Sequence, residues 1–320
     1  MRSKWVSDVM SAVAESESGT KSCCAFCGIA EIDDVKLKDC DGCDLVRYCS
    51  DDCNENHKPD HEDACKKRSA ELYDELLFRQ PESSHLGDCP ICSLPLPLEN
   101  EKSALKSCCS TIICDGCVYA NKVREDKMRL VQSCPFCREP APKTREEYDG
   151  RNMKRIEMND PVAIHFEGME QHNKGENNCA FQYFTKAAGL GHADAHYMLA
   201  EMYHYGLGVE KDEGKEIHHM KEAAISGHPF ARHDLGWLEL NNGNIERAVK
   251  HLIIAAIQGN DKSMKALMKT FKIKKELVQK EVLAATLRAH QAAVDATKSP
   301  QREKGEEWLR MQKDAHPHLY

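Results

Sequence analysis

Cysteine is the residue type in this chain whose number and spacing could do chemistry. Of its 17 cysteines, 16 lie between Cys23 and Cys137, and the segment 138–320 contains only Cys179. Many of them form Cys-x2-Cys pairs, in which two sulfurs share one tight turn of chain. Zinc takes four thiolate or imidazole ligands at the corners of a tetrahedron, so two such pairs complete one site. The spacing therefore predicts four structural zinc ions in the first half of the chain.

A disulfide framework is the alternative use of so many cysteines, and it is typical of secreted chains. The stretch from Trp5 to Ala14 is interrupted by Ser7 and Asp8, so it lacks the apolar centre of a signal peptide. No apolar run of about 18 residues occurs, so no membrane span is expected. We therefore expect an intracellular protein, cytoplasmic or nuclear, whose thiols stay reduced and bind zinc.

The composition excludes several classes of function. A net charge of −8 with 30% charged residues argues against a nucleic-acid partner, because nucleic-acid binding requires a basic surface. The chain shows neither a glycine-rich phosphate loop nor a nucleophile elbow. At 320 residues it has room for two or three domains. The sequence thus favours a multi-module interaction protein, with no nucleic acid and no membrane among its partners.

The first ligand set contains seven cysteines and one histidine. In chain order its members are Cys24, Cys27, Cys40, Cys43, Cys49, Cys53, His61 and Cys65. The last two pairs have the i, i+4 spacing that places two side chains on one face of a helix. Tyr48 directly precedes Cys49 and is well placed to cover a metal.

This first set resembles the MYND finger over residues 24–65, including the Tyr-Cys step and the closing His-x3-Cys. The resemblance implies cross-braced pairing, with Cys24, Cys27, Cys49 and Cys53 on one ion and Cys40, Cys43, His61 and Cys65 on the other. Cys23 is interpreted as a bystander, and His57 is the alternative to His61. MYND fingers bind short proline-containing peptides of partner proteins, which is what the resemblance implies here. The alternative is that the finger only holds its own fold together.

The second ligand set consists of cysteines alone. Its members are Cys89, Cys92, Cys108, Cys109, Cys114, Cys117, Cys134 and Cys137. The outer pairs are Cys-Pro-x-Cys knuckles, and residues 118–131 are predicted to form a short helix. This set resembles the all-cysteine form of the RING finger, with Thr111 at the place where a histidine ligand is usual. The resemblance implies Cys89, Cys92, Cys114 and Cys117 on one ion and Cys108, Cys109, Cys134 and Cys137 on the other.

A RING finger has no nucleophile and acts by holding a charged ubiquitin-conjugating enzyme in an attack-ready geometry. The resemblance assigns Ile91, Pro135 and Phe136 to the apolar groove that contacts this enzyme. It assigns Arg138 to hydrogen bonds that bridge the enzyme and ubiquitin, for which the planar guanidinium fork is suited. Asn121 occupies the place of a groove tryptophan. The alternative is a degenerate finger, in which Ile91 and Phe136 are local packing and Arg138 is a solvated charge.

The second half of the chain is repetitive. The pieces KAAGLGH (186–192), EAAISGH (222–228) and IAAIQGN (254–260) recur at offsets of 36 and 32 residues. This period indicates stacked helix-turn-helix units, and the longer unit carries a loop extension from Gly206 to Val209 and the following EKDE. The motifs resemble Sel-1-like repeats, which are relatives of the TPR. We expect about four units, 160–192, 193–228, 229–260 and a diverged 261–296.

Stacked helical repeats offer an extended concave face, so the second half is predicted to bind a protein or peptide. The alternative is a spacer. Small alanines should allow close helix packing, and Gly191, Gly227 and Gly259 should end the second helix of each unit. The scattered histidines are interpreted as surface or packing residues; they are His192, His196, His204, His218, His219, His228 and His233.

The expected fold is two small cross-braced zinc modules followed by an all-α Sel-1-like, TPR-like solenoid. The expected segments are a disordered N-terminus (1–20), a MYND-type finger (21–66), a helical connector (67–85), a RING-type finger (86–140), a linker (141–159), the repeats (160–296) and a polar tail (297–320), of which 301–320 should be disordered. The predicted function is a RING-type ubiquitin ligase that recruits a conjugating enzyme through the RING and a substrate through the repeats. The alternative is a non-catalytic zinc-binding adaptor. A methyltransferase is excluded because no SET-like segment is present.

Overall fold

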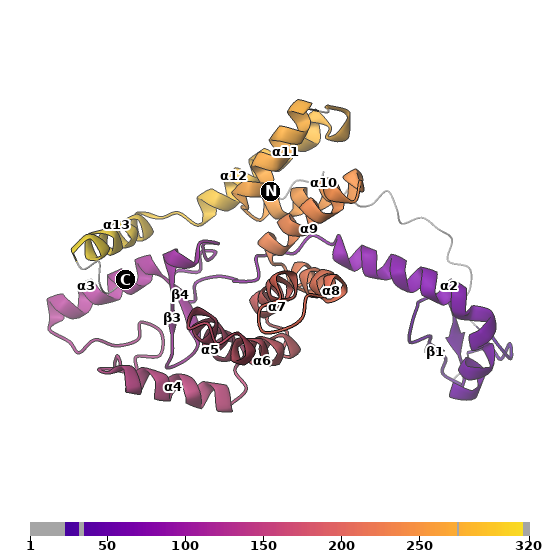
Figure 1. Cartoon of the computed structure of the whole chain (residues 1–320), viewed down its shortest axis with the longest axis horizontal. Helices are drawn as coiled ribbons and strands as arrows, with labels where there is room; N and C mark the ends of the chain where they lie inside the picture. Colours follow the sequence, from indigo (N-terminus) through magenta and orange to yellow (C-terminus); the bar gives the residue numbers. More distant parts are fainter. Residues whose placement is uncertain (1–22, 32–34, 274, 316–320) are drawn as a thin grey trace. The chain divides into compact units, whose positions relative to one another are not determined.

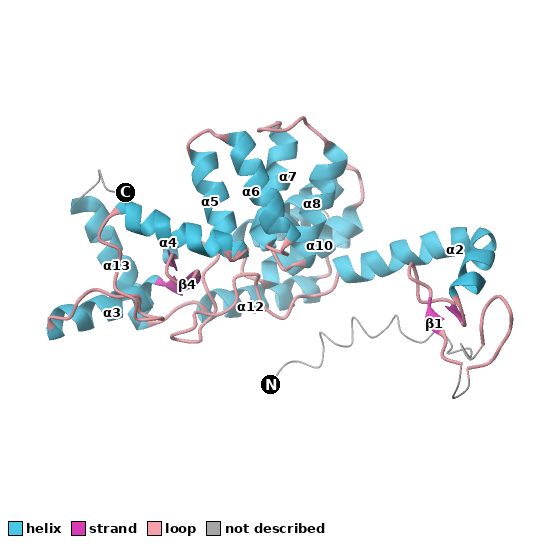
Figure 2. Cartoon of the chain, turned by 90° about the horizontal axis from the view of Figure 1, so that it is seen from below, coloured by secondary structure: helices cyan, strands magenta, loops and turns pink. Residues whose placement is uncertain are grey.

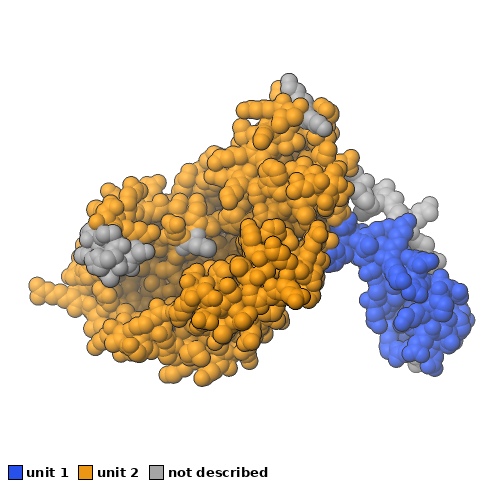
Figure 3. Space-filling view, in the orientation of Figure 1, with its two compact units in different colours: residues 1–76 blue, residues 77–320 orange. Residues whose placement is uncertain are grey.

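The structure is a computed structural model that describes residues 23–31, 35–273 and 275–315. The expected disordered segment 1–20 lies outside these residues. The chain divides into two compact units, residues 1–76 and 77–320, which Figure 3 draws in two colours.

The described residues of unit 1 have little regular structure outside one long helix. Strands β1 (Lys38–Asp39) and β2 (Arg47–Tyr48) form an antiparallel pair, and helix α2 spans Asp51–Leu77. We expected a separate connector helix from Ala70 to Phe78. Instead α2 begins within the finger, contains Pro59 in its third turn, and continues through the expected connector, where no glycine or proline occurs between Asp60 and Phe78.

Unit 2 opens with a second small module. The 3-10 turn η2 (Asn100–Lys102) precedes strands β3 (Ser103–Lys106) and β4 (Thr111–Cys114), which pair as an antiparallel hairpin. Helix α3 (Asp115–Met128) follows β4 directly and corresponds to the helix predicted at 118–131. The buried apolar cluster of this module contains Leu96, Ile113 and four of the predicted ligand cysteines. The module therefore has almost no core apart from its cysteines.

The segment 141–159, expected as a linker, contains helix α4 (Arg145–Glu157), whose N-terminus is capped by the Thr144 side chain. The repeat helices follow as α5 (Pro161–Asn173), α6 (Asn177–Gly189), α7 (Ala193–Tyr205), α8 (Glu213–Ile225), α9 (Pro229–Asn241), α10 (Ile245–Ile257), α11 (Asp261–Ile273), the 3-10 turn η3 (Lys275–Leu277) and α12 (Lys280–Ala296). Helices α5 to α11 each contain 13 residues. Figures 1 and 2 show them as a stack of helix pairs. The predicted all-α repeat fold is confirmed.

The repeat signals predicted from the sequence have their expected structural roles. Gly191, Gly227 and Gly259 adopt φ values of +82°, +88° and +93°, the left-handed region that ends a helix. The alanine pairs of the repeated pieces, at 187–188, 223–224 and 255–256, are buried in the helix interfaces. The predicted loop extension separates α7 from α8. Helices α11 and α12 lie in the segment 261–296, and the assignment of this segment to a diverged fourth unit stays a prediction.

The C-terminal segment differs from the expectation of a disordered polar tail. Residues 300–315 form helix α13 (Pro300–Ala315), which packs lengthwise against α3 (Figure 1). Gly116 and Gly305 lie so close together that a Cβ on Gly305 would come within 2.8 Å of the Gly116 nitrogen. The rings of Trp308 and Tyr119 are 5.9 Å apart. The polar composition of this segment did not predict a packed helix, because only a few of its residues contact α3.

Within the described residues, no helix combines the length and the apolar character that crossing a bilayer requires.

The extended loop of the second repeat supplies a test of the fold. Gly208 has φ +69°, and a Cβ there would lie 2.6 Å from the backbone carbonyl of Asn177. Gly175 has φ +83° but nothing within 4 Å of its Cβ position. We expect Gly175→Ala to destabilise by about 1–2 kcal/mol from left-handed strain alone. Gly208→Ala should destabilise considerably more, because backbone cannot move aside. Thermal unfolding followed by far-UV circular dichroism checks this, and equal losses in the two variants would contradict the structure.

Candidate metal centres

Three Cys-x2-Cys knuckles of the chain share one backbone geometry. The residue that follows each second cysteine has a positive φ: +74° at Gly28, +54° at Ser93 and +65° at Arg138. Its N–H donates to the carbonyl of the first cysteine at 2.8 to 3.0 Å. The first cysteine in turn donates its own N–H to the residue two places beyond the second cysteine. This double hydrogen bonding closes a tight loop and turns both sulfurs toward the same side.

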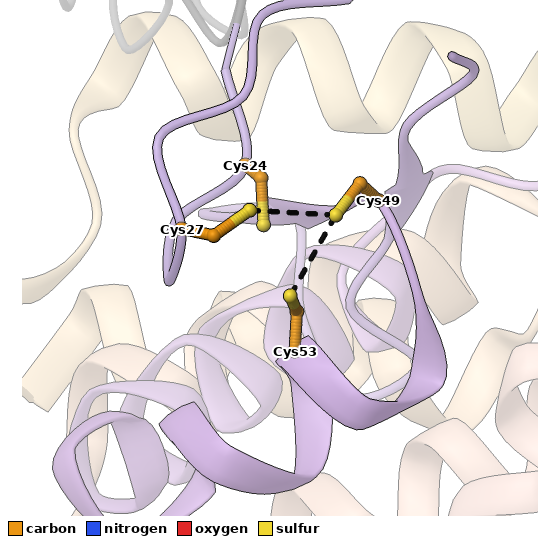
Figure 4. Close-up of side chains that lie close together, drawn as sticks. All are labelled: Cys24, Cys27, Cys49 and Cys53. Carbon is orange, nitrogen blue, oxygen red and sulfur yellow. Dashed lines mark hydrogen bonds between the residues drawn. The ribbon is translucent and has the colours of Figure 1, made fainter.

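In unit 1 the ligand atoms collect into the two groups predicted from the sequence. Cys24, Cys27, Cys49 and Cys53 form one group, and Cys40, Cys43, His61 and Cys65 form the other; within each group the donor atoms all lie within 4.8 Å of one another. Figure 4 shows the first group, with Sγ–Sγ distances of 3.5 Å between Cys27 and Cys49 and 3.6 Å between Cys49 and Cys53. A tetrahedron of sulfurs with zinc–sulfur bonds of ~2.3 Å has edges of ~3.8 Å. The spacing fits a metal at the centre.

His61 and His57 have different roles in the second group of unit 1. The His61 Nε2 lies 3.2 Å from the Cys43 sulfur, inside the group. The His57 Nδ1 instead lies 3.0 Å from the Tyr48 hydroxyl, and its ring stacks on His61 at 5.6 Å. Tyr48 is buried, and burial followed by the charge of nearby thiolates raises its pKa to about 12. His57 and Tyr48 therefore pack around the ligand His61 from outside the metal group.

In unit 2 the second ligand set also separates into two groups. Cys89, Cys92, Cys114 and Cys117 form one group, and Cys108, Cys109, Cys134 and Cys137 form the other, again with all donor atoms within 4.8 Å. The sulfurs of Cys108 and Cys109 are 3.9 Å apart, and those of Cys109 and Cys134 are also 3.9 Å apart. The neighbours in sequence therefore occupy two corners of one site.

The turn between β3 and β4 explains how adjacent cysteines can both face the metal. The Cys109 N–H bonds to the Lys106 carbonyl at 3.1 Å, and Ser110 adopts a left-handed φ of +51°. Thr111, at the usual place of a histidine ligand, donates its hydroxyl to the Cys109 carbonyl at 3.3 Å. Thr111 thus fixes the turn that presents Cys109.

The electrostatics of these groups favour a bound cation over a set of free thiolates. Hydrogen bonding with the neighbouring thiols of Cys27 and Cys53, together with burial, raises the pKa of Cys49 to about 12. Burial, followed by the interaction with Cys40 and Cys43, raises the pKa of Cys65 to about 12. Four thiolates within one group repel one another, so they are stable together only around a positive ion. A divalent ion with tetrahedral preference satisfies both the charge and the geometry.

Comparison with known proteins gives the same assignment for two of the regions. The sequence model of the MYND finger matches residues 24–65, and that of the Sel1 repeat matches residues 164–192, 193–228 and 229–260. The chain therefore carries a MYND finger and Sel1 repeats, as its motifs predict. Neither match covers residues 86–140. Because MYND fingers bind zinc and the Cys/His groups have tetrahedral spacing, zinc is the metal of these sites.

Two solved structures match part of the chain. A Sel1 repeat protein from Oxalobacter formigenes is 22% identical with a TM-score of 0.42, over 53% of this chain and 50% of that chain. A protective antigen of uropathogenic Escherichia coli with an SLR fold is 21% identical with a TM-score of 0.37, over 62% of this chain and 40% of that chain. The chain thus spans half or less of the length of these proteins.

The residues predicted to contact a conjugating enzyme lie on the knuckles of the second module. Ile91 and Phe136 are 42% and 49% exposed, whereas Pro135, which was predicted to line the same contact groove, is buried. Arg138 donates from Nη1 to the Asn121 Oδ1 at 2.9 Å, and the Asn121 Nδ2 donates to the Ser133 carbonyl at 3.1 Å. Asn121 therefore links α3 to the last knuckle and holds the Arg138 side chain against it.

Sequence reasoning missed a buried polar cluster in unit 2. The Asp194 Oδ1 lies 2.8 Å from the His85 Nε2 and 3.1 Å from the His228 Nε2. Burial alone would raise the pKa of Asp194, but hydrogen bonds from His228 and His85 hold this pKa well below its usual value. The cluster joins the segment before Cys89 to the N-terminal ends of α7 and α9. We interpreted His228 as a scattered packing residue, and its partner His85 is 143 positions away in the printed sequence.

The tautomer of His228 decides what this cluster can do. Its Nδ1 accepts the N–H of Ala231 at 3.1 Å as the N-cap of α9, so the proton of the neutral ring lies on Nε2 and points to Asp194. A neutral histidine that binds a metal through Nε2 must carry its proton on Nδ1, and in His228 that position accepts the Ala231 N–H instead. His85, Asp194 and His228 therefore form a hydrogen-bonded clasp. Asn260, which follows the next repeat glycine, caps its helix in the same way, whereas His192 after Gly191 makes no side-chain cap hydrogen bond.

Removal of a single ligand should remove a single ion. We expect the full chain to contain four zinc ions under reducing conditions, and Cys109→Ala to contain three. Cys179→Ala, which changes an exposed cysteine outside the four groups, should retain four. Native mass spectrometry counts the ions directly. Four ions in Cys109→Ala would show that Cys109 is not a ligand.

Burial of His165 predicts an acid-sensitive repeat array. Burial, followed by the neighbouring His192, lowers the pKa of His165 to about 3, with His228 and His85 adding to this and Asp194 opposing it. The folded pKa lies below the unfolded value of about 6.5, so the stabilisation is complete above that pH and is lost as the pH falls.

At pH 5 the loss from His165 should reach about 2 kcal/mol of unfolding free energy. His165→Phe should remove this part of the pH dependence, while the exposed His204→Phe should retain it. Chemical unfolding followed by circular dichroism at pH 7 and pH 5 measures the difference. Equal pH dependence in the wild type and His165→Phe would contradict the prediction.

Proposed function

We propose that this zinc-binding chain is a protein–protein interaction scaffold with three binding modules, and that the partner of residues 86–140 is a ubiquitin-conjugating enzyme. The scaffold function is supported by the MYND finger and the Sel1 repeats, both of which generally mediate protein interactions. The ligase function is the finer proposal. In it the repeats bind the protein to be modified, and the second zinc module recruits the charged enzyme.

Exposed apolar side chains support a binding role for the MYND finger. Phe26 lies inside the first knuckle and Ile29 follows it; they are 50% and 49% exposed, and Leu45 is also exposed. Three large exposed apolar side chains on so small a module offer apolar area that a partner could cover. An aromatic ring beside aliphatic side chains suits an extended proline-containing peptide, because that peptide needs no internal hydrogen bonds.

The observation that carries the ligase proposal is the backbone of Arg138. The equivalent position in the first knuckle is Gly28, which adopts its left-handed φ of +74° without strain. Arg138 adopts φ +65° at a cost of about 1–2 kcal/mol that glycine would avoid. A strained residue whose side chain is exposed and oriented by Asn121 supports a role for that side chain. A hydrogen-bonding bridge to an enzyme–ubiquitin conjugate is such a role.

The strained position also provides a matched test. Arg138→Gly should raise the thermal stability of the protein, because it relieves the left-handed strain, and should also slow the discharge of ubiquitin from a charged conjugating enzyme. Ser93→Gly makes the same backbone change in the preceding knuckle and should raise stability without slowing discharge.

Ile91→Ala should weaken binding of the enzyme by about 1–3 kcal/mol. A discharge assay over a panel of conjugating enzymes, with calorimetric binding, provides the readouts.

The results distinguish a ubiquitin ligase from a scaffold without ligase activity. Discharge by the wild type that fails in Arg138→Gly and persists in Ser93→Gly supports the ligase. If the wild type discharges none of the charged enzymes, or if Arg138→Gly matches it, the ligase proposal fails and the scaffold remains.

A further inference from the structure

The C-terminal helix α13 places a buried arginine against the second zinc module. Arg302 is only 4% exposed. Its Nη1 donates to the carbonyl oxygens of Pro95 at 2.7 Å and Thr297 at 2.8 Å, and its Nη2 donates to that of Leu94 at 3.1 Å. The same Nη2 lies 3.4 Å from the Cys92 sulfur. In the described part of the chain, these contacts include no carboxylate.

The preceding residue contacts the same zinc group. The Gln301 Nε2 lies 3.5 Å from the Cys117 sulfur and 3.1 Å from the Gly116 carbonyl oxygen. Cys92 and Cys117 both belong to the third group of ligand atoms, with Cys89 and Cys114. Consecutive residues at the start of α13 therefore donate to two of the four sulfurs of one site.

Charge explains why an unpaired arginine can be buried at this place. Zinc with four thiolates carries a net charge of −2, and this charge lies at the sulfurs. A guanidinium that is removed from water needs an anionic partner, and the Cys92 thiolate of the third group lies within hydrogen-bond distance of it. The N–H groups in turn withdraw electron density from the thiolates and make them less open to protons and oxidants.

The helix packing holds this contact in place. Gly116 and Gly305 allow α3 and α13 to approach closely, and Trp308 packs against Tyr119. Lys102 and Glu306 add an exposed ion pair at 3.6 Å. Neither Gln301 nor Arg302 contacts the fourth group, which belongs to the same module and so serves as an internal reference.

We propose that the first turn of α13 is part of the third zinc site, with Arg302 and Gln301 as outer hydrogen-bond donors that retain the metal. Zinc retention at the Cys89–Cys92 knuckle then depends on a segment that follows the repeats in the sequence. The ligands are supplied by one module and their outer partners by the end of the chain. This proposal is independent of whether residues 86–140 bind a conjugating enzyme.

The test measures zinc release from the full chain to a chromogenic chelator under reducing conditions. Arg302→Gln should release one of the four ions about 10-fold faster or more, which is the range for the loss of an outer partner. Arg302→Lys, which keeps the charge but loses the fork, should lie between it and the wild type. Arg310→Gln changes an exposed arginine of the same helix and should behave as the wild type. Alkylation and peptide mapping should show Cys89, Cys92, Cys114 and Cys117 as the cysteines that become reactive first.

A second variant distinguishes the effect of the Arg302 hydrogen bonds from the effect of packing α13 against α3. Trp308→Ala removes the contact with Tyr119 but retains both donors. We expect it to release the third zinc more slowly than Arg302→Gln does. In the cobalt-substituted protein, Arg302→Gln should also shift the thiolate-to-cobalt charge-transfer band, because a hydrogen bond to sulfur is lost. The proposal is overturned if Arg302→Gln releases zinc no faster than Arg310→Gln, if Trp308→Ala equals Arg302→Gln, or if the cobalt band is unchanged.

Discussion

The tetrahedral bonding of sulfur to zinc is the interaction on which both N-terminal modules depend. Modules of roughly 40 to 50 residues bury too little apolar surface to fold without help. The described core of the first module consists of Cys24, Leu37 and Tyr48 with partly buried neighbours, and that of the second is largely its own cysteines. Each zinc can contribute ~10–16 kcal/mol of apparent binding free energy, which is more than such a core could supply. The hydrogen-bonded knuckles and their left-handed residues exist because two sulfurs must face one ion.

Because zinc supplies the stability of these modules, the residues between the ligands do not have to be buried in a core. Ile91, Phe136 and Phe26 sit at knuckle turns with half of their surface exposed, which a module with an apolar core would have avoided. Arg138 occupies a position where glycine would be more stable. The repeat half follows the opposite principle, because its alanines are buried between helices and stability comes from the stacking of like units. The chain thus combines metal-held contact modules with a helical array that needs no metal ligand in its described part.

The sequence predicted those features that depend on short spacings. Cys-x2-Cys pairs, the His61–Cys65 step and the 32- and 36-residue offsets are local signals, and they led to the ligand groups and the helix pairs. Contacts between distant segments left no such signal. Arg302 reaches Cys92 across 210 positions, and His85 reaches Asp194 across 109. The helix α13 is polar overall, so its docking depends on one glycine, one tryptophan and one arginine that composition cannot single out. Asn121 was interpreted as a departure from the family pattern, and only the geometry shows that it holds Arg138.

The central claim is that four separate zinc ions are held by fifteen sulfur ligands and one nitrogen ligand, as the four groups require. Zinc-edge X-ray absorption on the full chain measures the average ligand shell directly. The account predicts a shell of nearly pure sulfur at ~2.3 Å with a nitrogen contribution of one ligand in sixteen, and no short zinc–zinc distance. A shell rich in nitrogen or oxygen, or a zinc–zinc distance typical of a fused thiolate cluster, would contradict it.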